Sequence, residues 1–514
     1  MTFFESLVLL LAIAILLLQV SRRLSIPYPT MLAAAGVLLA LVPGAPAIGL
    51  DPQTALVLFI APVLVDEAFD FQVGSIRRLW RPLFSLAVVA VLLSAAAVAW
   101  LGVTMAGLPL FAAIALGAIV APPDAAAATA VLQSVSMPRR SVVLLKGESL
   151  LNDASALLLF TAALAFQSHG SLDLEVGFHL AVAAPGGILL GFACAWLFSH
   201  FLRFFTGTLG GNLLEFVSCF GVWIIAEHLG LSAVLCLVTF AMTIAQSVGR
   251  VTPPRMRIHS FAVWGTTVFL LNVLAFLLMG LQARTIVLEM PMGRLQQAGW
   301  FAASVVLCLI LIRMTWVIIY NRLAAHFAIF RGSYEPSTLR HGILVGWCGM
   351  RGLLTLATAF ALPADFPQRD LIVLTAFAVV LATLVVQGLT LAPLVRLLKL
   401  DGEDDLDDEL ARVRADLASV ALSSLDGQTG RVADHWRFAF EASRHAAQNS
   451  EGGDASLDEK RQLGFSALRL QRQRLETLRT EQRIGADAFL IIQEELDFTE
   501  VSLSSESDRH IEES

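Results

Sequence analysis

The first four hundred residues of the chain alternate long apolar stretches with short polar connections. Each apolar stretch runs for about 20 residues, the length at which an α-helix crosses the hydrocarbon core of a bilayer. Backbone polar groups inside a bilayer must be satisfied within the segment, so these stretches are expected to be helices. The pattern predicts an all-α polytopic membrane protein. Its thirteen transmembrane helices are expected near residues 3–20, 27–46, 53–72, 82–106, 110–133, 141–168, 176–203, 212–229, 231–248, 259–282, 297–325, 341–363 and 369–396.

The arginines between the expected helices are distributed unequally over alternate connections. Fourteen lie in one set of connections, and only Arg284, Arg294 and Arg369 lie in the other. Cytoplasmic connections of membrane proteins carry the excess of basic residues. The skew therefore predicts that the N-terminus lies outside and the C-terminus in the cytoplasm.

Two of the expected helices contain residues that interrupt helices. Ala121-Pro-Pro-Asp124 lies in the middle of the fifth, and proline removes a hydrogen-bond donor and clashes with the preceding turn. Gly346-Trp-Cys-Gly-Met-Arg-Gly352 lies in the twelfth. Helices 1–6 and 8–13 would then form two inverted halves with one broken helix each, an arrangement typical of a transporter site. A kink or close helix packing is the alternative for either break alone.

The sixth expected helix carries two carboxylates, Glu148 and Asp153, inside an apolar run. A charge at the bilayer centre costs roughly 2.5–3.5 kcal/mol, so such residues usually belong to ion or proton pathways. Residues four apart share a helix face, which puts Ser149 beside Asp153. Carboxylate and hydroxyl oxygens suit Na⁺, K⁺ or Li⁺ after partial dehydration. We predict that Asp153 binds the cation and the proton; a second structural ion pair is the alternative for it.

Glu148 and Asn152 share a different face of this helix. The expected partner of Glu148 is Arg351, at mid-span of the twelfth helix, because pairing would remove two isolated charges from the membrane. Interrupted helices also expose a positive N-terminal and a negative C-terminal end. Asp124 is expected to offset the former and Arg351 the latter. For Asp124, balancing a helix end and direct contact with the ion both stay open.

The third expected helix carries three acidic residues, Asp66, Glu67 and Asp70. Three acids in one span exceed what packing requires. We expect one of them to reach the ion site and the others to lie at the cytoplasmic end. Glu215 and Glu227, near the ends of other helices, are expected to be solvated.

Composition separates the last part of the chain from the rest. The whole chain is 57% hydrophobic and 15% charged, with a net charge of −7. Residues 401–514 contain 26 acidic and 13 basic residues, a net charge of −13, which leaves +6 for residues 1–400. Apolar residues recur at helical spacing between Asp458 and Leu496, which indicates a helical hairpin or a partner helix.

We therefore expect two parts, a transmembrane domain over residues 1–400 and a largely helical cytoplasmic tail over residues 401–514. The end of the tail, from Ser504 onward, is expected to be disordered. A regulatory contact through the tail is one interpretation of its acidic charge, and a simply solvated surface is the other.

Several motifs resemble the cation:proton antiporter superfamily, in its sodium/proton exchanger branch. They are Gly147-Glu-Ser-Leu-Leu-Asn-Asp-Ala154, Gly349-Met-Arg-Gly352 and Val386-Gln-Gly-Leu-Thr-Leu391, and the resemblance covers about residues 1–398. It implies a thirteen-helix inverted-repeat fold, a homodimer, and a core of helices 4–6 and 11–13 that moves against a dimer scaffold. It also implies that Asp153 is the shared cation and proton carboxylate, assisted by Ser149 and Glu67, and that Glu148 and Arg351 form a structural pair.

Two positions bear on stoichiometry and ion choice. Asn152 stands where electrogenic relatives carry a second aspartate, and the Asn-Asp form implies electroneutral exchange. Many members have a threonine before the aspartate of the broken fifth helix, whereas this chain has Pro123 before Asp124. Only the backbone carbonyl of Pro123 is then left as a ligand. The sequence does not choose between Na⁺ and K⁺.

The resemblance implies a secondary active antiporter of the cell membrane, serving pH and cation homeostasis, rather than an enzyme. No cofactor and no nucleic-acid partner are expected, and the five cysteines lie singly without metal-ligand spacing. A passive cation channel and an intramembrane aspartyl enzyme using Asp124 and Asp153 are the competing classes. The enzyme would require a Gly-x-Gly-Asp type of segment, which the sequence lacks.

Overall fold

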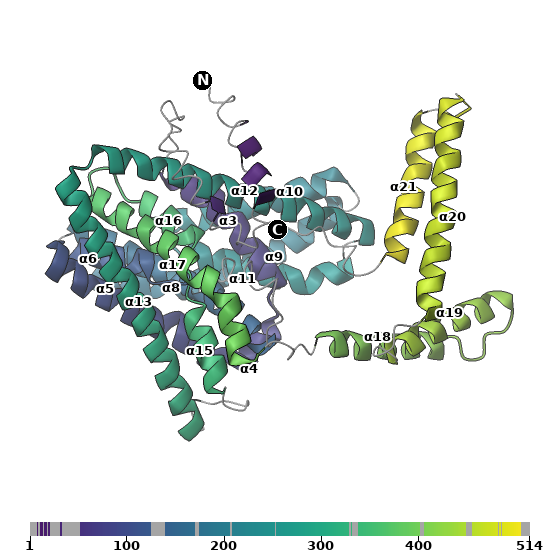
Figure 1. Cartoon of the computed structure of the whole chain (residues 1–514), viewed down its shortest axis with the longest axis horizontal. Coiled ribbons are helices and arrows are strands. Elements are labelled where there is room, and N and C mark those ends of the chain that lie inside the picture. Colours follow the sequence, from purple (N-terminus) through teal and green to yellow (C-terminus); the bar gives the residue numbers. More distant parts are fainter. Residues whose placement is uncertain are drawn as a thin grey trace. The chain divides into compact units, whose positions relative to one another are not determined.

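The structure is a computed structural model, and it is helical throughout the residues it describes (Figure 1). These are residues 8, 11–13, 15–17, 19–20, 31–32, 52–124, 139–169, 174–205, 208–251, 253–327, 330, 338–400, 406–448, 455–481, 483–484 and 486–504. They divide into two compact units, one within residues 1–403 and one within residues 404–513. Each unit is described by itself.

The first unit contains long helices joined by short connections. Its elements are α3 (Pro52–Asp70), α4 (Val73–Phe84), a π-helical segment (Ser85–Ala90), α5 (Val91–Ala106), α6 (Leu110–Val120), α8 (Arg139–His169), α9 (Leu174–Phe205), α10 (Leu209–His228), α11 (Ala233–Val251), α12 (Pro254–Glu289), α13 (Met292–His326), α15 (Leu339–Trp347), α16 (Leu353–Phe360) and α17 (Arg369–Leu398). Where the structure describes the chain, these helices cover the apolar stretches of the sequence. The first two expected helices and the second half of the fifth fall largely on residues outside the described ranges.

The expected connection before the fourth helix is helical instead. α4 begins at Val73 and runs through the π-helical segment into α5. Its exposed side carries Arg77 and Arg78, while Leu79 is buried, so this amphipathic start does not stand out as an apolar stretch. The Trp316 indole N–H of α13 donates to the carbonyl and hydroxyl oxygens of Ser85, both at 3.1 Å. π-Helical segments commonly occur where a side chain interrupts the regular helical hydrogen bonds in this way.

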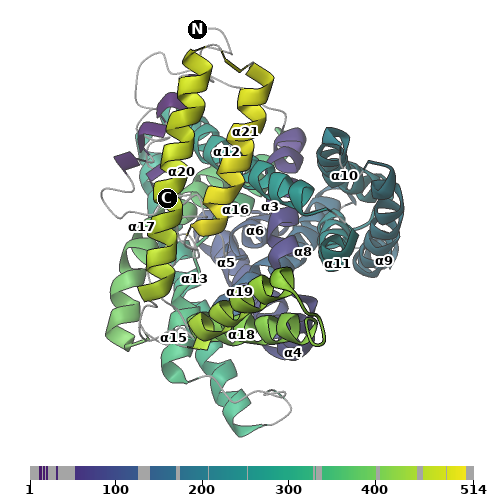
Figure 2. The same ribbon diagram turned by 90° about the vertical axis from the view of Figure 1, so that its right-hand side faces the viewer.

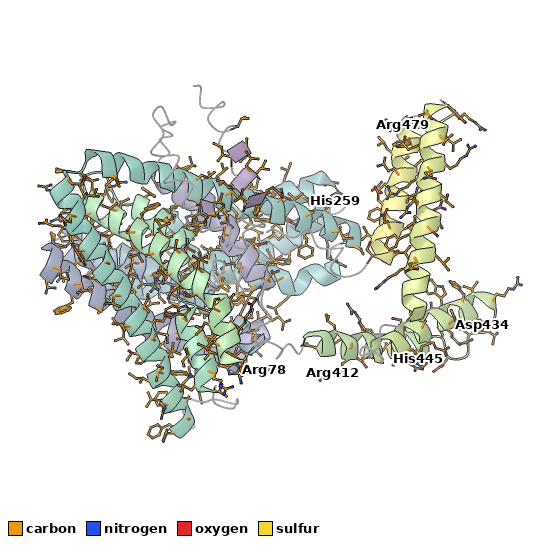
Figure 3. All side chains as sticks on the ribbon, viewed as in Figure 1. Arg78, His259, Arg412, Asp434, His445 and Arg479 are labelled. Carbon is orange, nitrogen blue, oxygen red and sulfur yellow. The ribbon has the colours of Figure 1, made fainter. Side chains whose placement is uncertain are left out.

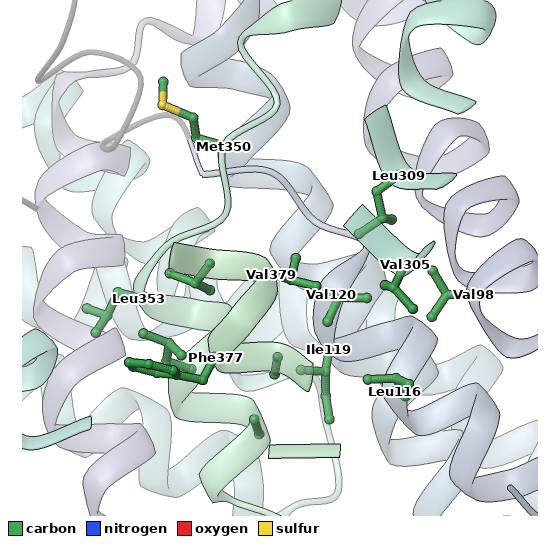
Figure 4. Close-up of a cluster of buried hydrophobic side chains, with 14 of the residues drawn as sticks. Val98, Leu116, Ile119, Val120, Val305, Leu309, Met350, Leu353, Phe377 and Val379 are labelled. Carbon is green, nitrogen blue, oxygen red and sulfur yellow. The ribbon is translucent and has the colours of Figure 1, made fainter. Parts of the chain in front are cut away.

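Two groups of helices pack around separate apolar clusters. The first cluster belongs mainly to α5, α6, α8, α12, α13, α15, α16 and α17; Figure 4 shows part of it, with Leu116, Leu309 and Val379 labelled. The second belongs mainly to α3, α9, α10 and α11, and the last three of these helices gather at one side of the unit (Figure 2). α8 packs on α6 and α11, and α3 packs on α16, so the two groups adjoin along α3, α8 and α16.

The outer surface of the first unit is apolar over most of its helices. Among the described residues, six helices are long and apolar enough to cross a membrane, namely Val73–Ala106, Ser141–Gln167, Ala181–Leu202, Met256–Leu278, Met292–His326 and Arg369–Leu398. Large outward-facing side chains such as Trp196, Phe204 and Trp300 are more than two-thirds exposed. Apolar surface of this extent is unfavourable in water and favourable in lipid. The first unit is therefore a multi-pass membrane domain.

The second unit consists, over its described residues, of two helix pairs. α18 (Leu406–Ser423) packs on α19 (Arg431–Gln448), and α20 (Ala455–Thr480) packs on α21 (Ala486–Leu503). Arg472 joins the second pair, because it lies 2.5 Å from Asp497 and also contacts Glu500. Arg479, labelled in Figure 3, lies over the ring of Phe489. α20 and α21 thus form a helical hairpin over the segment where apolar spacing indicates one. The disorder expected from Ser504 onward concerns residues that, after Ser504 itself, lie outside the described ranges.

Candidate functional site

Two non-helical segments meet inside the membrane domain. α6 ends at Val120, directly before Ala121-Pro-Pro-Asp124, because two consecutive prolines supply no amide donors. α15 ends at Trp347, and residues 348–352 separate it from α16. The backbone N–H of Asp124 donates to the carbonyl of Met350 at 2.7 Å, which joins the two segments. Figure 4 shows them where they pass each other, between the labelled residues Val120 and Leu353.

Asp124 lies at the N-terminal end of α16. Its Oδ2 accepts a hydrogen bond from the backbone N–H of Leu353, the first residue of that helix, at 3.2 Å. A carboxylate at this place satisfies an unpaired amide and compensates the positive end of the helix dipole. The contact that balances a helix end, expected from the sequence, is therefore present.

Gly352 makes this approach of Asp124 sterically feasible. A Cβ atom built on Gly352 would overlap the carboxylate of Asp124. We expect Gly352→Ala to push that carboxylate away from α16 and to destabilise the protein by about 1–3 kcal/mol, as overpacking does. Thermal unfolding of the purified protein measures the effect. Gly299→Ala is the matched control, because no atom lies within 4 Å of its added methyl group; equal melting temperatures for the two variants would contradict the assigned contact.

Arg351 lies at the C-terminal end of α6. Its side chain is 1% exposed. It donates to the carbonyl of Val120 at 3.1 Å, to that of Ala121 at 3.4 Å, and to that of Gly349. These contacts place a positive charge at the negative end of the α6 dipole, as expected from the sequence.

The prediction that Glu148 pairs with Arg351 is wrong. Glu148 pairs with Arg313 of α13: the two guanidinium nitrogens of Arg313 reach the two carboxylate oxygens, and the Nη2–Oε2 distance is 3.0 Å. Arg313 also donates to the carbonyl of Val345 at 3.1 Å. Both members of the pair are at most 3% exposed. Because the guanidinium passes beside Gly349, where a Cβ would lie 2.5 Å from its Cδ, a small residue is required in that segment.

Asn152 connects α8 to the non-helical segment after α6. Its side-chain nitrogen donates to the carbonyl of Pro123 at 2.9 Å, and the residue is fully buried. The Pro123 carbonyl is thus held by α8 and keeps one further lone pair. The role of Asn152 in this structure is to fix the position of the interrupted segment.

One cavity contains all five residues predicted to bind the cation or the proton. Glu67 of α3, Ser149 and Asp153 of α8, and Pro123 and Asp124 of the non-helical segment line it. Its volume is about 390 Å³ with its open mouth included. Asp153 and Ser149 are buried, at 8% and 4% exposure, while Glu67 and Asp124 are half-buried. That these residues bind ions stays a prediction.

Thr355 is a cavity residue that sequence reasoning missed. It lies one turn into α16, lines the same cavity and is 1% exposed. The sequence suggested that the cavity lacks a threonine hydroxyl, because Pro123 stands where many family members have threonine. Thr355 adds a hydroxyl-bearing residue to the same lining. The signal was its position three residues after Gly352, which lies directly before α16.

The cavity has the chemistry of a weak site for a small cation. Three carboxylates and two hydroxyl groups approach it, and its remaining walls are apolar, formed by Ile60, Val63, Leu64, Pro122, Leu353 and Leu354. Carboxylate oxygens in such surroundings strongly favour either a bound cation or a bound proton over an empty charged state. A group with these two occupants can exchange one for the other.

Comparisons with known proteins agree on one family. The family model described as "Sodium/hydrogen exchanger, transmembrane" matches residues 8–397. A protein of Bacillus pumilus named "Sodium, potassium, lithium and rubidium/H(+) antiporter" is 30% identical over 422 residues, which are 78% of this chain and 62% of that protein. The "Uncharacterized Na(+)/H(+) exchanger YjcE" of Escherichia coli is 28% identical over 94% of this chain and 95% of its own length.

The fold also has a solved counterpart. The structure of the sodium proton antiporter MjNhaP1 from Methanocaldococcus jannaschii at pH 8 matches with a TM-score of 0.61 and 16% sequence identity. The match covers 78% of this chain and 98% of that one. At this identity the likeness shows a shared fold.

Proposed function

Because this chain belongs to the sodium/hydrogen exchanger family, we propose that it exchanges protons for monovalent cations across the membrane at the cavity between α3, α8 and α16. One observation carries the proposal: Glu67, Asp124, Ser149 and Asp153 converge where helices are interrupted and the two packed groups adjoin. A carboxylate that holds a cation or a proton, but not both together, couples the two flows. The protein is then a secondary active transporter, and the cation is its substrate rather than a cofactor.

Asp153 is the exchanging carboxylate in this proposal. It is the most deeply buried of the three cavity carboxylates, so its charged form with neither cation nor proton bound has the largest desolvation cost. Ser149, one turn away, and Thr355 supply hydroxyl oxygens, and Glu67 supplies a second carboxylate on the opposite wall. Asp124 contributes its negative charge to the cavity while it caps α16.

We place the alternating movement at the boundary of the two apolar clusters. The group with α5, α6, α8, α13 and α15–α17 would move against the group with α3 and α9–α11, so that the cavity opens to each side in turn. The same proposal includes thirteen helices in two inverted halves and a homodimer. It also includes an external N-terminus and a cytoplasmic tail that makes a regulatory contact. The separate clusters support the movement, and the skewed distribution of arginines supports the orientation.

The activity is tested in proteoliposomes that contain the purified full-length chain. Vesicles are loaded with acid, and proton efflux is recorded after external Na⁺, K⁺ or Li⁺ is added, with choline as the control. We expect efflux with at least one of the three cations and none with choline. The name of the Bacillus pumilus relative includes all three ions, so the series also ranks them. Equal efflux in choline would indicate a passive proton leak and contradict exchange.

The stoichiometry is a further prediction. With Asn152 bound to the Pro123 carbonyl rather than acting as a second exchanging acid, one proton is expected to exchange for one cation. Setting the membrane potential to zero or to about −100 mV at fixed ion gradients should leave the rate unchanged, because no net charge crosses the field. A strong dependence on potential would mean that Glu67 or Asp124 carries a second charge.

Thr355 offers a sharper test of the cavity. We expect Thr355→Val to raise the cation concentration for half-maximal exchange about tenfold while leaving the maximal rate within a factor of two, since one of several oxygen ligands is lost. Thr358→Val is the matched control, because Thr358 is buried on the same helix but does not line the cavity. If both variants behave like the parent protein, Thr355 does not contact the cation.

A further inference from the structure

A second cavity lies between α3, α9, α10, α11 and α12. Its volume is about 720 Å³ with its open mouth included. Five aromatic side chains line it, namely Phe69, Phe198, Phe240, Phe261 and Trp264. They are arranged at angles to one another: the ring centroids of Phe69 and Phe261 lie 5.9 Å apart, and those of Phe198 and Phe240 lie 5.6 Å apart, both pairs edge to face. In such pairs the positive edge of one ring lies against the negative face of the other, and together the rings give the cavity an aromatic lining.

A carboxylate is fixed among these rings. Oε2 of Glu215 accepts a hydrogen bond from the Ser260 hydroxyl at 2.5 Å and one from the Trp264 indole N–H at 3.0 Å. Glu215, expected to be solvated, is half-buried and hydrogen-bonded to α12, whereas Glu227 near the C-terminal end of α10 is exposed. Asp66, Asp70 and Arg257 also line the cavity. Three carboxylates and one guanidinium give it a formal excess of two negative charges.

This cavity is separate from the exchange site. The two share no lining residue. They lie against different faces of α3, since Glu67 lines the exchange cavity and its neighbour Asp66 lines this one. An occupant of the second cavity would therefore act on exchange through helices that the two cavities share or that pack between them, α3 among them. Of the three acidic residues of α3, Glu67 lines the exchange cavity, and Asp66 and Asp70 line the second cavity.

We propose that the second cavity binds a hydrophobic organic cation, an ammonium or guanidinium group carried on an aromatic or alkyl body. A cation over aromatic faces is attracted by the ring quadrupoles, and more strongly where water is excluded. The excess of carboxylates favours a positive ligand and repels anions. A lipid chain would bury the carboxylates without a counter-charge, and a small inorganic ion would leave the aromatic walls unused.

Calorimetric titration of the full-length chain in phosphatidylcholine nanodiscs tests the proposal. The probe is benzyltrimethylammonium, which is permanently charged and carries an aromatic body. Tetramethylammonium lacks that body, and phenylacetate replaces the positive charge with a negative one. We expect saturable binding of the first probe, binding of the second weaker by about tenfold or more, and none of the third. Phenylacetate binding as tight as that of benzyltrimethylammonium would overturn the proposal.

Variants place the probe in this cavity. Glu215→Gln should weaken binding of benzyltrimethylammonium about tenfold, while Glu227→Gln, on the same helix but exposed, should leave it unchanged. Phe261→Leu removes a ring at the open side, where Phe261 is 56% exposed, and should also weaken binding even if the Glu215 variant does not fold. Asp153→Asn should bind normally. Unchanged binding in the Glu215 and Phe261 variants, or loss of binding in the Asp153 variant, would overturn the assignment. The binding result does not depend on whether the protein exchanges protons for cations.

Discussion

Asp153→Asn is expected to lower cation-driven proton flux to the level of protein-free vesicles. An amide has nearly the shape of the carboxylate, but it neither releases a proton at physiological pH nor carries a charge for the cation. Asp153 lines the cavity and is 8% exposed, so bulk water does not take the place of its carboxylate as a ligand for the cation or the proton. The measurement is proton efflux from acid-loaded proteoliposomes after addition of the preferred cation.

Asp365→Asn is the matched control for this variant. Asp365 is exposed in the connection between α16 and α17, and its amide should leave both flux and assembly unchanged. Size-exclusion chromatography of both variants separates loss of function from loss of fold. Normal cation-driven flux in a well-folded Asp153→Asn protein would move the exchanging role to Glu67 or Asp124.

Arg313→Gln is expected to destabilise the protein by about 3–5 kcal/mol, the largest effect on stability that we anticipate. The substitution leaves the Glu148 carboxylate buried and charged without its bidentate partner, since Glu148 is 1% exposed and both its oxygens contact Arg313. Thermal unfolding in detergent measures the loss. Arg294→Gln, exposed near the start of the same helix, is the control and should unfold at the parent temperature.

The double variant tests the contact itself. Glu148→Gln combined with Arg313→Gln removes both charges and should recover part of the loss, because two neutral amides are cheaper to bury than one unpaired carboxylate. Strictly additive losses would show that the two residues are not paired. The combination of Glu148→Gln with Arg351→Gln should be close to additive, because Arg351 binds backbone carbonyls at the end of α6.

Helix positions and interruptions could be read from the sequence because they depend on local chemistry. Apolar length and helix-breaking residues mark where α6 ends before Pro122 and where α15 and α16 separate. The same reasoning placed Asp124 and Arg351 at helix ends, where they lie against α16 and α6, since a charge belongs at the helix end of opposite sign. Helical spacing also brought Ser149 and Asp153 to one face, and both line the cavity.

The partner of Glu148 could not be obtained in this way. Spacing along α8 determines which residues share a face, but not which neighbouring helix that face meets. Arg313 lies at mid-span of α13 and Arg351 lies between α15 and α16, and packing of α13 beside α15 brings Arg313 to Glu148. Glu215 was missed for a related reason: position near a helix end suggests solvent, whereas Ser260 and Trp264 of α12 cover it.

Coupled, uphill proton movement tests the central proposal most directly. Proteoliposomes containing the full-length chain are loaded with the preferred cation at equal internal and external pH. When that cation is Na⁺ or Li⁺, valinomycin and equal K⁺ on both sides hold the potential at zero; when it is K⁺, valinomycin is left out. Dilution into medium that lacks the preferred cation creates an outward gradient of that cation alone. We predict that the interior becomes acid, because each departing cation is replaced by a proton at the cavity lined by Asp153 and Glu67, and that Asp153→Asn abolishes the change. An interior that stays at the external pH while the cation leaves would contradict exchange and identify a passive pathway.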